Sequence, residues 1–169
     1  ICARVDGSLA TLVRAIVGPA IELASVSDRW CMPRLLDPSA RGWMPLRESL
    51  QALLRIAGAK LADVVLGECS YPGSPIADRL AITQETPGAL TDLATLDTLR
   101  VGLLARRHTL VVHHGHPMTQ EALGLAATEP ELAAYLLIKA FRLGRGLDAA
   151  LDTKLIEHVV GARWVTKAG

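Results

Sequence analysis

The sequence is poor in cysteine and in aromatic residues. Its three cysteines, Cys2, Cys31 and Cys69, are odd in number and widely spaced. This fits neither a disulfide framework nor a zinc site and predicts reduced thiols. Aromatic residues make up 4% of the chain while half of it is apolar, so Ala, Leu and Val supply most of the apolar content. Such a composition is typical of packed helices and argues against a disordered chain.

Other absences narrow the class of protein. No apolar run approaches the roughly 20 residues that a membrane span needs, so we expect no membrane insertion. A formal net charge of +1 and the lack of a long basic run argue against nucleic-acid binding. The motifs G-x-x-x-x-G-K-[ST], G-x-G-x-x-G and G-x-S-x-G are missing. The chain begins at Ile1 without the order of a signal peptide, which predicts a cytoplasmic protein with further residues upstream.

Apolar spacing predicts a mainly α fold, in which a single domain over 1–169 forms an orthogonal or irregular helical bundle. N-terminal helices are expected within 8–66, the first at 8–17 after an N-cap at Ser8. The clearest follows Pro45, covers 46–66 and ends at Gly67. A Gly- and Pro-rich linker over 67–89 comes next, where 76–82 suits a short strand or a helical turn.

The C-terminal part, 90–161, has the spacing of further helices. Leu93, Leu96, Leu103 and Leu110 recur at helical steps and predict a helix to about residue 112. Residues 109–112 also suit a strand because they are mostly β-branched, but the helical register continues through them. Shorter helices are expected over 119–127, from about 130 to 143 after a capping signal that contains Pro130, and over 147–160.

A histidine cluster, His113-His114-Gly115-His116, lies five residues after His108 and is the main candidate for chemistry. On a strand, His114 and His116 would project to the same face, as the ligands of many metal sites do. No further ligand follows at a suitable spacing, and histidines also suit the end of a helix, where they bind free carbonyls. We therefore predict no metal, no cofactor and no catalytic residue, and we place this cluster at a helix end or on the surface.

Two other interpretations of this region stay open. The stretch from Thr98 to Glu121 resembles the segment around the His-His-x-x-x-Asp motif of condensation-type acyltransferases, but Met118 stands at the position of the acid. Residues 118–123 are similar to the first helix of a helix-turn-helix DNA-binding regulator, although acids such as Glu129 and Glu131 follow where base or phosphate contacts are needed. A degenerate acyltransferase lobe, a His-dependent metal enzyme and a DNA-binding regulator are therefore the alternative functions.

The segment from Trp30 to Trp43 is irregular and contains Pro33, Pro38 and Gly42. Two Trp residues in such a segment indicate either a loop pinned to the protein body or an exposed surface for a partner. This segment, the Leu-rich helix after it, the Gly/Pro-rich linker and the spacing of 96–143 together resemble the small accessory protein of the type III secretion sorting platform.

This resemblance implies an all-α, non-catalytic cytoplasmic adaptor. Such an adaptor bridges the pod protein and the inner-membrane ring, and so lies close to that membrane through protein partners. It implies no catalytic residues. We expect partner contacts at Trp30, Trp43, His108, His113 and His116; the oligomeric state is left open.

Overall fold

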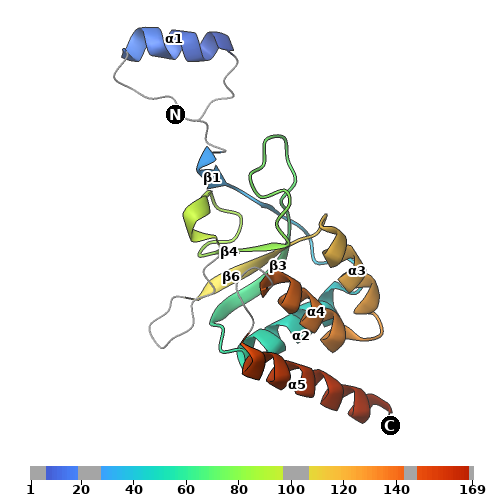
Figure 1. The fold of residues 1–169 in the computed structure, drawn as a ribbon. Helices are drawn as coiled ribbons and strands as arrows, with labels where there is room; N and C mark the ends of the chain where they lie inside the picture. The colour runs from blue at the N-terminus through green and yellow to red at the C-terminus, as the bar shows by residue number, and fades with distance from the viewer. Residues whose placement is uncertain (1–6, 19–27, 97–106, 143–147, 168–169) are drawn as a thin grey trace.

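The computed structural model describes residues 7–18, 28–96, 107–142 and 148–167, which form a mixed α/β fold (Figure 1). The predicted mainly α bundle is wrong, because strands lie among the helices. The helices are α1 (Gly7–Val17), α2 (Trp43–Ile56), α3 (Pro117–Leu125), α4 (Pro130–Arg142) and α5 (Ala149–Lys167). The strands are β1 (Trp30–Cys31), β2 (Arg34–Leu35), β3 (Leu61–Glu68), β4 (Ala81–Gln84), β5 (Thr91–Asp92) and β6 (His108–His113), and a 3₁₀ helix, η2 (Leu93–Thr95), follows β5.

The larger sheet has the strand order β2-β3-β6-β4, while β1 and β5 pair separately as an antiparallel ribbon. β3 and β6 are parallel neighbours, and β2 and β4 run antiparallel to the strands beside them. Gly67 pairs with His113 at the ends of the two parallel strands. The carboxyl ends of β3 and β6 therefore meet at one edge of the sheet, the edge at which ligands bind in many open α/β sheets.

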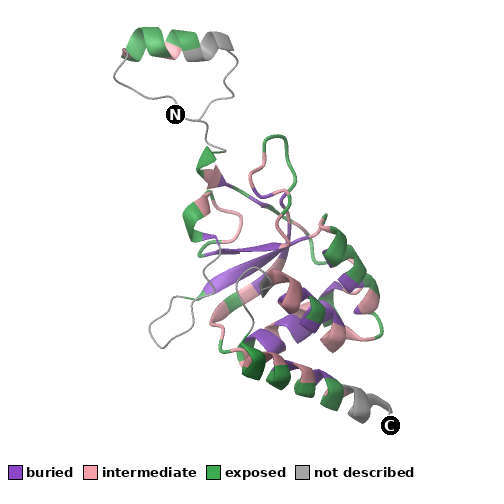
Figure 2. Cartoon of the chain, viewed as in Figure 1, coloured by how far each residue is buried: buried purple, intermediate pink, exposed green. Residues whose placement is uncertain are grey.

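Alternate residues of the central strands face two different apolar layers, because successive side chains of a strand point to opposite faces. Val64 of β3 and Leu110 and Val112 of β6 pack with the helices. Val65 and Val111 belong to a second apolar cluster on the other face, which also contains Cys31, Cys69, Ile76, Ile82 and Leu96. Helices thus cover one face of the sheet and loops cover the other; β6 is buried along its whole length between them, while β3 is buried only in part (Figure 2).

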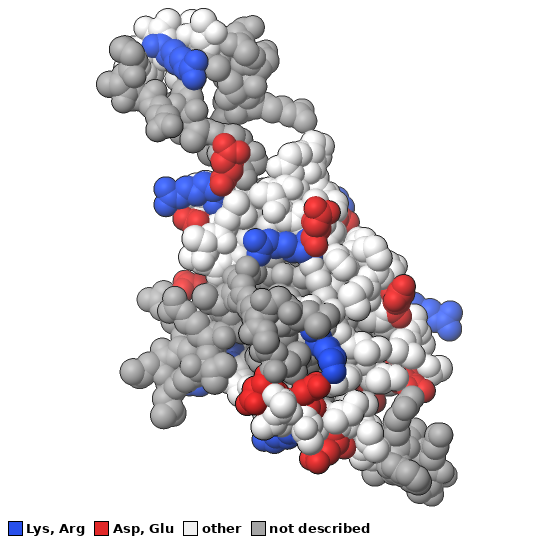
Figure 3. Space-filling view, in the orientation of Figure 1, with Lys and Arg blue, Asp and Glu red and all other residues white. Residues whose placement is uncertain are grey.

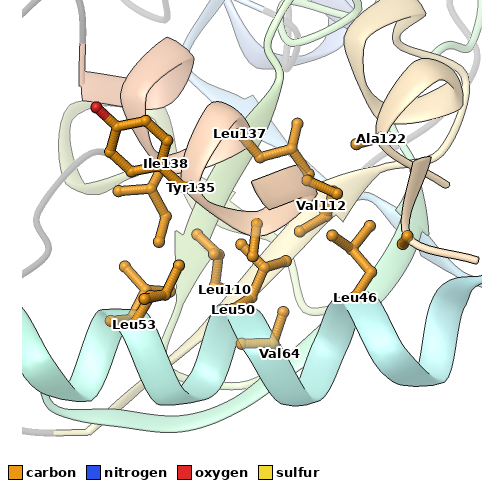
Figure 4. Packing of buried hydrophobic residues seen from close by; sticks show 14 of the residues in the cluster. Leu46, Leu50, Leu53, Val64, Leu110, Val112, Ala122, Tyr135, Leu137 and Ile138 are labelled. Carbon is orange, nitrogen blue, oxygen red and sulfur yellow. The ribbon is translucent and has the colours of Figure 1, made fainter. Parts of the chain in front are cut away.

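The helical layer is centred on α2, whose buried side chains recur at helical spacing. Leu46, Leu50 and Leu53 are each at most 2% exposed and point toward the sheet and α4 (Figure 4). Burying a Leu side chain contributes roughly 1.5–3 kcal/mol, so this stripe contributes much of the free energy of folding. Arg47 ties α2 to β3, since its Nη2 lies 2.7 Å from Oδ1 of Asp63.

The helix predicted over 46–66 ends at Ile56 instead, and after a turn over 57–60 the chain continues as β3 from Leu61. Gly58 adopts a φ of 76°, a left-handed conformation that favours glycine and turns the chain into the strand. The apolar residues Leu61, Val64 and Val65 of β3 do not alternate strictly with polar ones, and their spacing also fits a helical stripe. Gly67 is therefore a strand residue, and the predicted helix cap at this position is wrong.

The helix predicted up to residue 112 is also wrong. The described part of that range contains β5, η2 and β6, and residues 97–106 lie outside the described residues. Leu96 and Leu110, assigned to one helical stripe, pack on opposite faces of the sheet. The all-α fold implied by the resemblance to the secretion accessory protein is contradicted as well, since β6 lies inside the expected helical hairpin over 96–143.

Several local predictions are confirmed. α1 matches the helix expected at 8–17, α3 and α4 match those expected near 119–127 and 130–143, and the region 76–82 overlaps β4. The end of the helix expected at about residue 143, the start of the one expected at 147, and Cys2 lie outside the described residues. Cys31 and Cys69 are free thiols. Among the helices that the structure describes, none has both the length and the apolar character needed to cross a membrane.

Candidate functional site

His113 is the last residue of β6, and its imidazole is surrounded by oxygen atoms at the carboxyl edge of the sheet. Nε2 lies 3.0 Å from Oε1 of Glu68 and 3.1 Å from Oγ of Ser70. Nδ1 lies 3.2 Å from the backbone carbonyl oxygen of Arg79. We call Glu68, Ser70, His113 and the Arg79 carbonyl the His113 cluster. The side chain of His113 is 2% exposed, so the cluster is anchored in the protein body.

These contacts constrain the chemistry of the His113 cluster. A carbonyl oxygen and a carboxylate can only accept hydrogen bonds, so the ring satisfies Arg79 and Glu68 together when both of its nitrogens carry a proton. In that state Nε2 has no lone pair to take the proton of Ser70, as a catalytic base would have to do. The geometry therefore favours a carboxylate–imidazolium pair that joins β3 to β6 over a serine nucleophile.

The acid of the pair is held ionised by its surroundings. The backbone N–H of Ser70 donates to Glu68 over 2.9 Å and is the main cause that lowers the pKa of Glu68 below its usual value of 4.5. Partial burial opposes this change, and the hydrogen bond and charge of His113 support it. A carboxylate at the end of β3 is therefore stabilised mainly by local backbone geometry.

The rest of the predicted histidine cluster forms the turn from β6 into α3. His116 is the N-cap of α3, and its Nδ1 accepts a hydrogen bond from the Met118 amide at 3.2 Å. Burial and the neighbouring His113 lower the pKa of His116, while Asp78 opposes the shift. The lowered pKa favours the neutral ring, which alone can accept that bond. The prediction that these histidines bind free carbonyls at the end of a helix is wrong for His116, which lies at the N-terminus of α3 and accepts a hydrogen bond from an amide.

The paired arrangement of His114 and His116 that a strand would give is absent from this turn, because β6 ends at His113. Across residues 7–18, 28–96, 107–142 and 148–167, no group of three or more His, Cys, Asp or Glu side chains is arranged to hold a metal ion. The His113 cluster offers two such side chains, Glu68 and His113. The residues present therefore give no basis for assigning a metal site here.

His108, at the start of β6, lies away from the rest of the cluster. It is 8% exposed, and within the described residues its Nδ1 has no hydrogen-bond partner. It lines a hollow of about 330 Å³ together with Thr83, Glu85, Thr95 and residues of the loop that leads to β5. The predicted partner role of His108 stays a prediction.

The two Trp residues have different positions. Trp43 begins α2 and is 1% exposed within the hydrophobic core, where its side chain is not available to a partner. Trp30 lies half-buried in β1 and lines an apolar groove of about 450 Å³ on the loop-covered face. We call this feature the Trp30 groove; it is lined by Trp30, Cys31, Met32, Arg34, Tyr71, Pro72, Gly73 and Leu90.

The Trp30 groove is an exposed apolar surface held by a defined framework. The side chains of Met32, Tyr71 and Leu90 are 56%, 37% and 49% exposed, while Cys31 is buried. The amide of Met32 donates to the hydroxyl of Tyr71 at 3.4 Å, and Trp30 pairs with Asp92 across the β1–β5 ribbon. Met, Trp, Tyr and Arg side chains are enriched in protein interfaces, and all four are present here.

Charge around the groove is not uniform. Nε of Arg29 lies 3.1 Å from Oδ2 of Asp92, and its guanidinium also lies over the Trp30 ring, 5.4 Å from the centroid. Arg34 is exposed, and none of the described carboxylates forms an ion pair with it. The face shown in Figure 3 carries charges of both signs interspersed among neutral residues, without a large field of one sign. The exposed guanidinium of Arg34 therefore stands beside an apolar surface without an ion pair to any described carboxylate, although Glu68 lies opposite Arg34 in the β2–β3 register.

The sequence identified some of these residues and missed others. It marked Trp30 and His113 as candidates, but it gave no signal for Glu68, Ser70, Tyr71 or Leu90. Glu68 is brought to His113 by parallel pairing of β3 with β6, and Tyr71 and Leu90 reach Trp30 through loops. Comparisons with protein-family models, curated proteins and solved structures find no match to this chain.

Proposed function

We propose that this chain is a non-catalytic adaptor that binds a protein partner through the Trp30 groove. The observation that carries the proposal is the exposed apolar lining of the groove, where Met32 and Leu90 are each about half exposed. Isolated apolar residues are common on surfaces, but apolar side chains gathered in a concave site mark interaction surfaces. The His113 cluster supports a non-catalytic function, because Glu68 contacts the same nitrogen of His113, Nε2, that would have to take the proton of Ser70.

An adaptor needs a second contact, and α1 provides a candidate. Leu12, Ile16 and Val17 of α1 are 55%, 74% and 46% exposed, and α1 lies apart from the sheet and its helices (Figure 1). An isolated helix of 11 residues is marginal in water, so α1 gains stability when a partner covers its apolar side. Helices of this kind commonly bind by placing the apolar face in a groove of another protein.

The cellular setting remains a prediction from the sequence resemblance. It assigns the chain to the cytoplasmic sorting platform of a type III secretion apparatus, between the pod protein and the inner-membrane ring. The groove and α1 support an adaptor in general and do not select this apparatus. The pod protein and the cytoplasmic part of the ring protein from the same organism are therefore the first partners to test.

The experiment compares two double variants that carry the same pair of substitutions. M32S/L90S removes the apolar lining of the groove, while M118S/L136S changes Met and Leu residues of similar exposure on α3 and α4. Each purified chain is titrated with the purified candidate partner by calorimetry. We expect M32S/L90S to weaken binding at least about tenfold and M118S/L136S to bind like the wild type.

Each outcome decides a separate part of the proposal. Binding that M32S/L90S leaves unchanged would reject the groove as the contact. No binding of either secretion protein by the wild type would reject the assignment to that apparatus. A protein identified by crosslinking in cells would then take the place of the secretion proteins as the candidate partner. It would be accepted only after the same titration with the purified protein.

A further inference from the structure

We infer that the Trp30 groove selects a partner segment in which a carboxylate lies next to apolar side chains. This inference rests on the proposed function and adds the chemistry of the partner. Its basis is the combination of two features on one surface, namely the apolar lining and the exposed guanidinium of Arg34, which forms no ion pair with a described carboxylate. The groove volume of about 450 Å³ suits one or two large side chains of a bound segment rather than a whole packed domain.

The apolar part of the ligand follows from the lining. Trp30, Met32 and Leu90 offer flat and flexible apolar surfaces, and the Met side chain adapts to the shape of a neighbour. The hydroxyl of Tyr71 already accepts a hydrogen bond from the Met32 amide, so this polar group of the groove wall has a partner within the chain. A partner side chain such as Leu or Phe would displace water from this surface at little polar cost.

The acidic part follows from the two arginines near the groove. Asp92 compensates Arg29, whose guanidinium also lies against Trp30. Arg34 lines the groove itself, and within the described chain it has no carboxylate partner. A guanidinium matches the two oxygens of a carboxylate, and the bond gains strength beside an apolar surface that excludes water. A carboxylate of the partner is thus the group that this position recognises best.

α1 does not fit this description and is not assigned to the groove. The charged side chain of its sequence is Arg14, which would meet Arg34 with the same sign of charge. The occupant that we assign to the groove is a segment of another protein that carries Asp or Glu within three or four residues of an apolar anchor.

The test uses a phage-displayed library of random 12-residue peptides, selected on the immobilised 169-residue chain. Three further targets are selected in parallel: R34E, R55E and M32S/L90S. R55E makes the same charge change on α2, which packs on the opposite face of the sheet, and serves as the matched control. Urea unfolding of each variant verifies that it is folded.

We expect peptides from the wild type and from R55E to combine aromatic or aliphatic residues with Asp or Glu. Synthesised as fluorescent peptides, they should bind R34E at least about tenfold more weakly than R55E, and M32S/L90S more weakly still. Selection on R34E should instead enrich Lys or Arg at the position of the acid.

Two results would overturn the inference. If the selected peptides need Met32 and Leu90 but carry no acid, or bind R34E and R55E equally, the charge preference is wrong while the groove remains a binding site. If no peptide is enriched, or if all peptides bind M32S/L90S as well as the wild type, both the charge preference and the role of the groove as a binding site are rejected.

Discussion

Nε2 of His113 lies 3.0 Å from Oε1 of Glu68, and this contact joins the carboxyl ends of the two parallel strands. The same nitrogen lies 3.1 Å from Oγ of Ser70, the distance expected for a serine nucleophile and its base. Because the carboxylate competes for this nitrogen, the arrangement holds β3 and β6 together rather than activating Ser70. We call this contact between Glu68 and His113 the clip.

The clip should make stability depend on pH through Glu68. The lowered pKa of Glu68 in the folded chain means that its ionised form stabilises the fold above the ordinary value of 4.5. This contribution is lost as the pH falls through the lowered folded pKa. We expect E68Q to cost about 1 kcal/mol at neutral pH in urea unfolding, and less in acid. A cost that does not change between neutral and acid solution would contradict this account.

Gly115 should be required beside the clip for reasons of space. A Cβ atom at this position would lie 3.0 Å from Nε2 of His113 and 3.5 Å from Oε1 of Glu68. G115A should therefore displace the pair and cost about 1 kcal/mol. Gly124 in α3 is the matched control, since a Cβ there meets nothing within 4 Å. G124A should be neutral or stabilise the helix by up to about 1 kcal/mol, as thermal unfolding can measure.

Gly67 should be required by its neighbour in β6. A Cβ at Gly67 would come within 2.5 Å of Cγ1 of Val111, so G67A should cost roughly 1–3 kcal/mol. Shortening the neighbour creates room, and a double-mutant cycle with V111A should give a coupling free energy that recovers part of that cost. If the free-energy costs of G67A and V111A are additive in the double mutant, Gly67 and Val111 do not lie as close together as described.

Ser70 should not react as a nucleophile. Ser70 and Glu68 both contact Nε2 of His113, at 3.1 and 3.0 Å, and a protonated Nε2 that donates to Glu68 has no lone pair to accept the proton of Ser70. A fluorophosphonate probe that labels serine hydrolases should leave the chain unlabelled under conditions in which it modifies a control protease. Stoichiometric labelling that disappears in both S70A and H113Q would contradict the non-catalytic function.

Much of the helical layer could be predicted from the sequence, and most of the sheet could not. Pro130 and the capping residues before it mark the start of α4 by local backbone chemistry, which a sequence shows directly. β3 and β6 contribute apolar residues to both faces of the sheet, so these residues do not alternate with polar ones. Such runs match helical spacing as well as strand spacing, and the spacing therefore predicts helices where the structure has strands.

The candidate sites depend on contacts between distant parts of the chain. His113 stood out in the sequence, but Glu68 is 45 residues away and reaches it through the pairing of parallel strands. Trp30 stood out as a single aromatic residue, whereas its groove also needs Tyr71 and Leu90 from two later loops. No local motif marks Tyr71 or Leu90 in the sequence. Each belongs to the groove only because folding places its exposed side chain beside Trp30.

The central claim is that the Trp30 groove is the surface through which this chain binds proteins. At 18.0 kDa the chain suits two-dimensional NMR, in which a ¹⁵N-labelled sample is titrated with the strongest peptide from the selection. We expect saturable shifts of the Trp30 indole N–H and of the Met32, Tyr71 and Leu90 amides, with α5 unchanged. Saturable shifts confined to Glu68, Ser70 and His113, with the groove signals unmoved, would contradict the claim and direct attention back to the His113 cluster.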